Sequence, residues 1–220
     1  MTRPDLVIFD CDGVLVDSET VSNRVLAANL TRHGLPMTTE RSMELFVGGT
    51  MRGAWGMARD MGADLPETWI DEIYGEIYAA LRAGVDVIAG IPALLDRLDA
   101  AGIPYAVGSN GSEAKMGITL GQNGLLDRFG NAIFSAHTLG TAKPDPGLYL
   151  AAATYFDVEP SRAVVVEDSA TGVKAAARAG MRCLGYAPHD DGAALRAQGA
   201  EVFDSMFIVP GLIGLGGAIE

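Results

Sequence analysis

Short apolar segments recur along the chain, and most are followed by a polar or glycine-containing break and then by a segment with helical periodicity. Brief apolar runs that end in polar residues are typical of strands buried inside a sheet. The segments that fit this description are residues 6–9, 105–107, 132–134, 163–166, 183–184 and 201–203. We predict a β-strand at each of them, with the weakest pattern at residues 183–184.

Helical patterns fill the intervals between these apolar segments. We predict helices over residues 91–101, 145–156 and 169–179, the last of them closed by Gly180. Strands that alternate with helices indicate a parallel sheet covered by helices on both faces. The sequence therefore predicts an α/β fold.

The interval from about Asp17 to Gly84 departs from this alternation. It contains helical patterns but no convincing strand. Apolar residues follow one helical face near its end, at Ile70, Ile73, Tyr74, Ile77, Tyr78 and Leu81. This interval is therefore predicted to be an α-helical domain inserted after the first strand.

The charge balance limits the kinds of partner that the chain can bind. With 28 acidic residues against 16 Lys and Arg, the formal net charge is −12. Such a field repels nucleic acids and anionic membranes, so neither is an expected partner. It also repels phosphate esters, so a phosphate-binding site in this chain needs positive charge placed close to the ligand.

Cysteine usage and the apolar segments near the ends of the chain favour a cytoplasmic protein. Cys11 and Cys183 can form one disulfide at most, and we expect both to be reduced thiols. No signal peptide is visible, and the apolar stretch at residues 206–219 contains Pro210 and is too short to span a bilayer. We therefore expect a soluble cytoplasmic protein.

Two aspartates follow the first apolar segment. Asp10 and Asp12 are separated by one residue, and in an extended chain this spacing directs both side chains to the same side. Two carboxylates so placed repel each other unless a cation or a shared proton lies between them, and hard oxygen ligands suit Mg²⁺. Gly13 then allows the chain to turn without a Cβ clash. The alternative is that the two aspartates only cap this turn.

A second acidic pair, Glu167 and Asp168, ends another apolar segment. Adjacent residues of a strand point to opposite sides, so we expect at most one of them to bind a metal directly. We assign that role to Asp168, with Glu167 contributing through water. The alternative is that Asp168 or Ser169 caps the helix that follows, and both roles can coexist.

A hydroxyl and a lysine are candidates for binding phosphate. Ser109 lies in a Gly-Ser-Asn-Gly turn between a predicted strand and a helix, where backbone N–H groups can bind an anion. Lys143 is one of only three lysines in the chain and lies in a loop with prolines, which suits a charge held in one place. Taken alone, the serine turn is a weak indication, because such turns are common.

Together, these four elements resemble the motifs of the haloacid dehalogenase superfamily, in the same order and over the whole chain. The matching segments are Phe9-Asp10-Cys11-Asp12-Gly13-Val14-Leu15-Val16-Asp17-Ser18, Ser109-Asn110, Lys143-Pro144 and Val166-Glu167-Asp168-Ser169. The resemblance implies a Rossmann-like parallel-sheet core from residues 1–16 and 86–220, with an α-helical cap from residues 17–85. It also implies a site at the carboxyl edge of the sheet, where every motif residue falls.

The resemblance also implies a role for each motif residue. Asp10 would be the nucleophile that forms an aspartyl phosphate, and Asp12 the general acid and base. Mg²⁺ would be held by Asp10, the backbone carbonyl of Asp12 and Asp168. The residues that would bind the transferring phosphoryl group are Ser109, Asn110 and Lys143.

Other members of the superfamily are distinguished by residues outside the four motifs. The acidic cluster argues against a dehalogenase, and the absence of any lysine before Lys115 argues against a phosphonate-cleaving enzyme with a Schiff-base lysine in its cap. The main alternative is β-phosphoglucomutase. Where its pattern has Lys, Arg and His, this chain has Val47, Met51 and Ser22, although Arg52 replaces the arginine if the register slips by one residue. Because so little charge is present to hold a second phosphate, hydrolysis is favoured.

The expected substrate is a small phosphorylated metabolite. The first two motifs look closest to bacterial sugar-phosphate phosphatases, including those that act on 6-phosphogluconate, so we expect a sugar or sugar-acid phosphate. A non-catalytic phosphate-binding module is the alternative from a different functional class, but every catalytic position is filled here. We expect a monomer or a small homo-oligomer.

Overall fold

The computed structural model describes residues 3–47 and 50–216. The chain divides into two compact units, one formed by Met1–Val16 and Val87–Glu220 and the other by Asp17–Asp86. The division after residue 86 lies one residue beyond the predicted end of the helical segment. The two units are described separately below.

The first unit contains a six-stranded parallel sheet with the strand order β3-β2-β1-β4-β5-β6. All the strands that the sequence predicted are present. The weakly predicted fifth strand extends over five residues, because it pairs with β4 on one side and β6 on the other. The bounds are β1 Leu6–Phe9, β2 Tyr105–Ser109, β3 Ile133–Ser135, β4 Ala163–Glu167, β5 Arg182–Tyr186 and β6 Glu201–Phe203.

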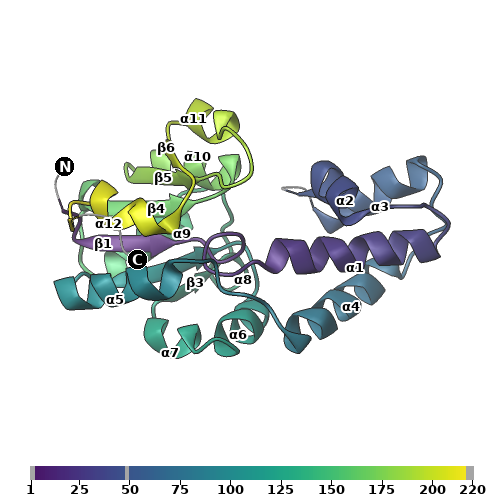
Figure 1. Ribbon diagram of the computed structural model, residues 1–220, viewed down its shortest axis with the longest axis horizontal. Coiled ribbons are helices and arrows are strands. Elements are labelled where there is room, and N and C mark those ends of the chain that lie inside the picture. The colour runs from purple at the N-terminus through teal and green to yellow at the C-terminus, as the bar shows by residue number, and fades with distance from the viewer. Residues whose placement is uncertain (1–2, 48–49, 217–220) are drawn as a thin grey trace. The chain divides into compact units, whose positions relative to one another are not determined.

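Helices cover both faces of this sheet, as Figure 1 shows. Their bounds are α5 Ile91–Ala101, α6 Glu113–Gly121, α7 Leu125–Phe129, α8 Ala136–Leu139, α9 Gly147–Tyr155, α10 Ala170–Arg178, α11 Ala193–Ala197 and α12 Val209–Leu212, with 3₁₀ turns η1 Pro160–Arg162 and η2 Met206–Ile208. Helix α9 begins two residues later than predicted, because the Asp145 side chain accepts a hydrogen bond from the backbone N–H of Gly147.

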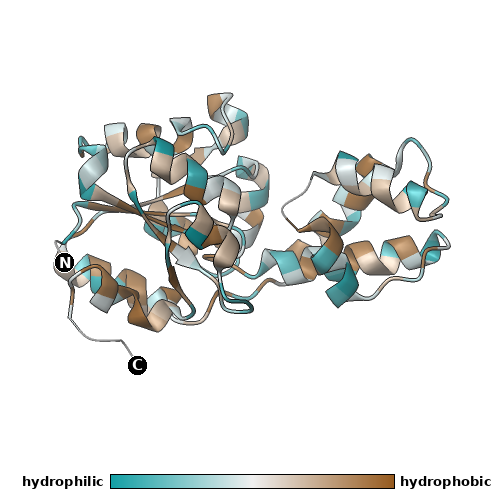
Figure 2. Ribbon diagram, turned by 90° about the horizontal axis from the view of Figure 1, so that it is seen from above, coloured by the Kyte–Doolittle hydropathy of each residue, from teal (hydrophilic) through white to brown (hydrophobic). Residues whose placement is uncertain are grey.

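Strand β1 is buried on both faces, which explains its unbroken apolar sequence. Leu6 and Ile8 belong to a core cluster with residues of α9 and α10. Phe9 packs edge-to-face against Phe129 of α7, with the ring centroids 6.4 Å apart. In Figure 2 the strands of this unit are predominantly coloured as hydrophobic. The residues that follow β1 therefore start from the buried interior of the sheet.

Over its described residues, the regular secondary structure of the second unit is all helical, as predicted. Its helices are α1 Ser18–Arg32, α2 Thr39–Phe46, α3 Met51–Asp60 and α4 Trp69–Ala83. The apolar face of α4 is narrower than predicted, since Ile73, Ile77 and Leu81 are buried but Tyr74 is 42% exposed. Trp69 extends this face and donates to Asn29 Oδ1 at 2.6 Å, which ties α4 to α1.

In the part of the chain that the structure describes, every helix is too short or too polar to cross a membrane.

Candidate active site

Polar residues gather where the central strands of the sheet end. Asp10 directly follows β1, Ser109 is the last residue of β2, and Glu167 is the last residue of β4. Since β2, β1 and β4 are neighbours and parallel, their carboxyl ends meet at one edge. The predicted site residues on these strands are therefore brought to the same edge of the core unit.

Three carboxylates converge at this edge. Asp10, Glu167 and Asp168 each offer an oxygen atom, and these oxygens lie within 4.8 Å of one another. Gly13 allows the loop after β1 to approach Asp168, because its φ is +76° and a Cβ atom there would lie 1.9 Å from Asp168 Oδ2. Clustered hard oxygen donors fit a cation such as Mg²⁺.

Lys143 supplies the positive charge that the acidic edge needs. Its side chain is 4% exposed, and its Nζ atom donates to Asp10 Oδ1 at 2.6 Å and to Glu167 Oε1 at 2.6 Å. Burial by itself lowers the pKa of Lys143, but the two carboxylates outweigh it and raise the pKa above its ordinary value. Lys143 is therefore a fixed cation between two of the three carboxylates.

The carboxyl group of Asp10 is buried deeply enough to resist ionisation. Burial raises the pKa of Asp10 to about 7, against the opposing effect of the Lys143 ammonium. A cation bound at the carboxylate cluster would favour the ionised form further. The ionised state of Asp10 thus depends on nearby positive charge.

Glu167 is held by protein groups on both of its oxygens. Oε1 accepts from Lys143 and, at 2.9 Å, from the hydroxyl of Tyr149, whereas Oε2 accepts from the backbone N–H and the hydroxyl of Ser169, each at 2.8 Å. Lys143 and Ser169 lower the pKa of Glu167 against the effect of its burial. These contacts associate Glu167 with Lys143 more closely than with a metal, and its predicted contribution through water stays a prediction.

Ser169 also performs the capping role that was one alternative for this segment. Its side chain accepts from the N–H of Gly172 at 3.0 Å at the start of α10. Asp168 therefore does not have to serve as the cap.

Asp12 has a cationic partner of its own, which the sequence analysis missed. Its carboxylate lies 2.7 Å from Lys115 Nζ, on α6, and both side chains are about four-fifths buried. Among the described residues, the carboxylate cluster consists of Asp10, Glu167 and Asp168 and leaves out the Asp12 side chain, because the extended geometry ends at Phe9 and the chain turns through Gly13. A metal contact of Asp12 through its backbone carbonyl stays a prediction. The scarcity of lysines was the only signal for Lys115, since a lysine on a helix is usually solvated.

Ser109 and Asn110 lie beside the lysine loop. The Ser109 hydroxyl is almost fully buried and accepts from the N–H of Gly111 at 3.0 Å. Asn110 Oδ1 accepts from the backbone N–H of Lys143 at 2.8 Å, and its amide donates back to the Lys143 carbonyl at 3.5 Å. Asn110 therefore holds the backbone from which the Lys143 side chain extends.

The two cysteines are buried thiols. Both are free and buried, as expected for reduced thiols, and burial raises the pKa of the Cys11 thiol well above its usual value. Cys11 lies between the two aspartates of the first motif but packs with its sulfur 3.9 Å from the hydroxyl of Thr119.

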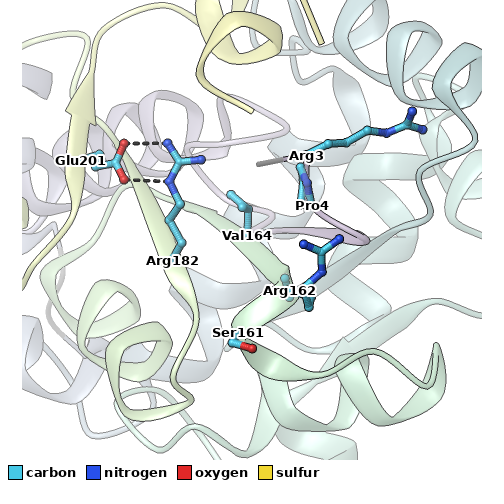
Figure 3. A pocket seen from close by; sticks show the side chains of 8 residues that line it. Arg3, Pro4, Ser161, Arg162, Val164, Arg182 and Glu201 are labelled. Atoms are coloured by element: carbon cyan, nitrogen blue, oxygen red, sulfur yellow. Dashed lines mark hydrogen bonds and ion pairs between the residues drawn. The ribbon is translucent and has the colours of Figure 1, made fainter. Parts of the chain in front are cut away.

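A separate hollow of about 290 Å³ lies at the opposite, amino-terminal edge of the sheet. Its lining includes Arg162 and Arg182, and Figure 3 shows the paired contacts of Arg182 with Glu201. Arg162 is paired in the same two-bond manner with Asp5 at 2.7 and 2.8 Å. These two guanidinium groups already face carboxylates, and Arg3, the third arginine of the lining, donates to the carbonyl oxygen of Ala101. The hollow therefore has little capacity for an anion, and the carboxyl edge is the candidate active site.

The chain is similar to known hydrolases along most of its length. The family model described as haloacid dehalogenase-like hydrolase matches residues 4–180. A 6-phosphogluconate phosphatase from Escherichia coli K12 is 30% identical over 194 residues, with 86% of each chain covered.

Solved structures show the same similarity across both units. A conserved haloacid dehalogenase-like protein from Agrobacterium tumefaciens has 35% identity and a TM-score of 0.87, with 96% of this chain and 97% of that chain covered. A hydrolase of this family from Deinococcus radiodurans, solved with bound phosphate and sodium, has 33% identity and a TM-score of 0.85, with 98% of each chain covered. The protein belongs to the haloacid dehalogenase-like hydrolases, among the phosphatases of that family.

Proposed function

We propose that this protein is a Mg²⁺-dependent phosphoric monoester hydrolase that forms an aspartyl phosphate on Asp10. The observation that carries the proposal is the convergence of Asp10, Asp168 and the Lys143 ammonium at one edge of the sheet. A carboxylate nucleophile, a cation site and a buried positive charge are the parts that transfer of a phosphoryl group to the protein requires.

Asp10 and Asp168, together with the backbone carbonyl of Asp12, are the groups proposed to hold the metal. Their oxygen chemistry suits Mg²⁺, and the close approach of Gly13 to Asp168 leaves no room for a side chain between the two loops. When bound, Mg²⁺ supplies charge neutralisation for the phosphoryl oxygens.

In the first step, the Asp10 carboxylate attacks phosphorus while the bond between phosphorus and the ester oxygen breaks. Asp12 donates its proton to the departing alkoxide, which leaves as an alcohol. The Lys143 ammonium, 2.6 Å from Asp10 Oδ1, balances the charge of the transferring phosphoryl group.

In the second step, Asp12 accepts a proton from water as the water attacks the aspartyl phosphate. Inorganic phosphate leaves, and Asp10 and Asp12 return to their starting states. The Lys115 ammonium, 2.7 Å from Asp12, stabilises the negative charge that Asp12 carries between the two steps. Ser109 and Asn110 are proposed to complete the phosphoryl site from the β2 turn.

The proposed substrate is a small sugar phosphate or sugar-acid phosphate, such as 6-phosphogluconate. The support is the similarity to a 6-phosphogluconate phosphatase over most of both chains. A phosphate-release screen over phosphorylated sugars, sugar acids, nucleotides and glycolate derivatives with Mg²⁺ tests it. We expect release, with sugar or sugar-acid phosphates giving the highest kcat/KM. Tight phosphate binding without release from any compound would instead support a non-catalytic binding module.

The choice between phosphatase and mutase rests on residues of the helical unit. Val47 and Met51 carry no charge, and the Ser22 hydroxyl donates to the Ser18 carbonyl at 2.7 Å within its own helix. Gly48 and Gly49, which belong to the same mutase-like segment as Val47, lie outside the described residues. A mutase must bind a doubly phosphorylated sugar and exclude water from the intermediate, and closure for this purpose requires substrate contacts. Arg52 is the exposed cation that could replace the missing arginine.

We therefore expect hydrolysis when β-glucose 1-phosphate is supplied with a trace of β-glucose 1,6-bisphosphate. The measurement follows inorganic phosphate and glucose 6-phosphate together. Phosphate should accumulate with little glucose 6-phosphate, since few charges are available to retain the bisphosphate. Rapid glucose 6-phosphate formation without matching phosphate would establish the mutase instead, and Arg52→Ala would then test the source of that activity.

A further inference from the structure

We propose that Tyr149 is a positioning residue of the active site: through Glu167 it fixes the direction in which the Lys143 ammonium presents its remaining N–H group. This inference rests on the proposed function in one respect, namely that Lys143 contacts the transferring phosphoryl group. Tyr149 lies on α9, outside the four motifs, and is not itself expected to touch the substrate.

The first observation is the sharing of one carboxylate oxygen. Glu167 Oε1 accepts from Lys143 Nζ at 2.6 Å and from the Tyr149 hydroxyl at 2.9 Å. The Lys143 Nζ atom also lies 5.1 Å from the centroid of the Tyr149 ring, within the range of a cation–π interaction. The Tyr149 hydroxyl therefore donates to the same Glu167 oxygen that binds Lys143, and the Tyr149 ring lies close to the Lys143 ammonium.

The second observation is that Glu167 has no freedom to move with the lysine. Its other oxygen accepts two hydrogen bonds from Ser169, each at 2.8 Å. A Cβ atom at Gly172 would lie 1.7 Å from Glu167 Oε1, so the helix backbone itself borders the carboxylate. Donors on both oxygens and a backbone wall fix the plane of the carboxylate.

An ammonium group has three N–H donors arranged as a tripod. In Lys143, two of them are directed at Asp10 Oδ1 and Glu167 Oε1. With two directions fixed, rotation about the Cε–Nζ bond is blocked, and the third N–H has one orientation. The direction of this third N–H therefore depends on the position of Glu167 Oε1. The Tyr149 hydroxyl helps to set that position.

The backbone around Tyr149 accommodates the ring at close range. A Cβ atom at Gly108 of β2 would lie 3.1 Å from Tyr149 Cε1, which is tighter than ordinary packing. The ring is fully buried in the core cluster beneath β1 and β2, so the hydroxyl cannot swing away from Glu167 without repacking the core.

A purely structural role for Tyr149 makes a different prediction. Loss of the hydroxyl alone leaves the ring, its packing and its cation–π contact in place, so Tyr149→Phe separates the two roles. Tyr155→Phe is the matched control, because Tyr155 ends the same helix, is 56% exposed, and pairs with Phe134 through its ring.

The experiment compares wild type, Tyr149→Phe and Tyr155→Phe in the presence of Mg²⁺. Calorimetry measures the affinities for inorganic phosphate and for orthovanadate, which adopts the five-coordinate geometry of the transferring phosphorus. Steady-state kinetics with an aryl phosphate give kcat and KM. For Tyr149→Phe we expect kcat and vanadate affinity each to fall by about tenfold, because a misdirected donor is felt most in the transition state. KM and phosphate affinity should stay within about threefold of wild type. Tyr155→Phe should change none of these.

A lowered Tm with unchanged kcat and unchanged vanadate affinity would overturn the inference and leave Tyr149 as a packing residue. Equal losses of phosphate and vanadate affinity would also contradict the inference, since they indicate that the site binds every anion less tightly and not only the transition-state geometry. If Tyr149→Phe does not fold, Ser169→Ala takes its place, because it removes a donor from the other oxygen of Glu167. An unchanged vanadate affinity of Ser169→Ala would again overturn the inference.

Failure of this inference is distinguishable from failure of the proposed function. A wild type that binds vanadate but hydrolyses no phosphate ester would refute the hydrolase, while the vanadate affinity of Tyr149→Phe would still decide the role of Tyr149. A wild type that binds neither vanadate nor phosphate would refute both.

Discussion

Asp10→Asn is expected to abolish turnover while leaving the protein folded. The amide has the shape of the carboxyl group but is a far weaker nucleophile, so no aspartyl phosphate can form. Loss of a nucleophile typically costs at least about 10³-fold in kcat. The measurement is phosphate release with Mg²⁺, followed over hours so that a loss of this size can be quantified.

The folded state should tolerate this change. Because burial raises the pKa of Asp10 to about 7 in the folded protein, the ionised carboxylate costs stability above its unfolded pKa, near 3.8. A neutral amide removes that cost, and Lys143 keeps Glu167 as its ionic partner. We therefore expect a Tm at pH 8 equal to or above that of wild type.

Asp127→Asn is the matched control, since it makes the same chemical change on the exposed side of α7. It should retain full activity. A phosphoryl group or beryllofluoride found on any residue other than Asp10 would contradict the assignment of the nucleophile, as would turnover by Asp10→Asn above the level explained by traces of wild type.

Removal of divalent cations is the second change with a large expected effect. Three carboxylate oxygens within 4.8 Å of one another repel a phosphate dianion, and Lys143 alone offsets only part of that charge. EDTA should therefore reduce phosphate release to background, and added Mg²⁺ should restore it.

A variant of the metal site makes this experiment specific. Asp168→Asn should raise the Mg²⁺ concentration for half-maximal activity by at least about tenfold, because it removes one anionic ligand. Asp127→Asn should leave that concentration unchanged. Full activity in EDTA, or the same Mg²⁺ dependence in Asp168→Asn and wild type, would refute the proposed metal site.

Local sequence patterns predicted most of the fold and placed three of the candidate site residues at one edge of the sheet. Apolar runs ending in polar residues predicted the parallel strands, since burial on both faces leaves no alternation to obscure them. Asp10, Ser109 and Glu167 could be placed at one edge because all parallel strands present their carboxyl ends on the same side. The helical insertion was likewise visible from its periodicity, as an interval from about Asp17 to Gly84, against an observed unit of Asp17–Asp86.

The strand order and the charge pairing were decided only by the tertiary structure. Neighbouring strands β1 and β4 are separated by more than 150 residues, and no local pattern specifies that pairing. Lys115 has the sequence context of an ordinary helical lysine, yet it lies 2.7 Å from Asp12. Lys143 is bonded to Glu167, which the sequence suggested as a water-mediated metal ligand.

Tyr149 shows the physical reason most clearly. In the sequence it is an aromatic residue on the apolar face of a helix, where burial alone explains it. Its hydroxyl acquires a role only because α9 packs against the sheet beside the end of β4, 18 residues further along the chain. The apolar pattern reflects the burial of each residue by itself, so it can be recognised from the local sequence. The hydrogen-bond and ionic partners of buried polar groups depend on which segments meet in the fold, so they cannot be recognised from the local sequence.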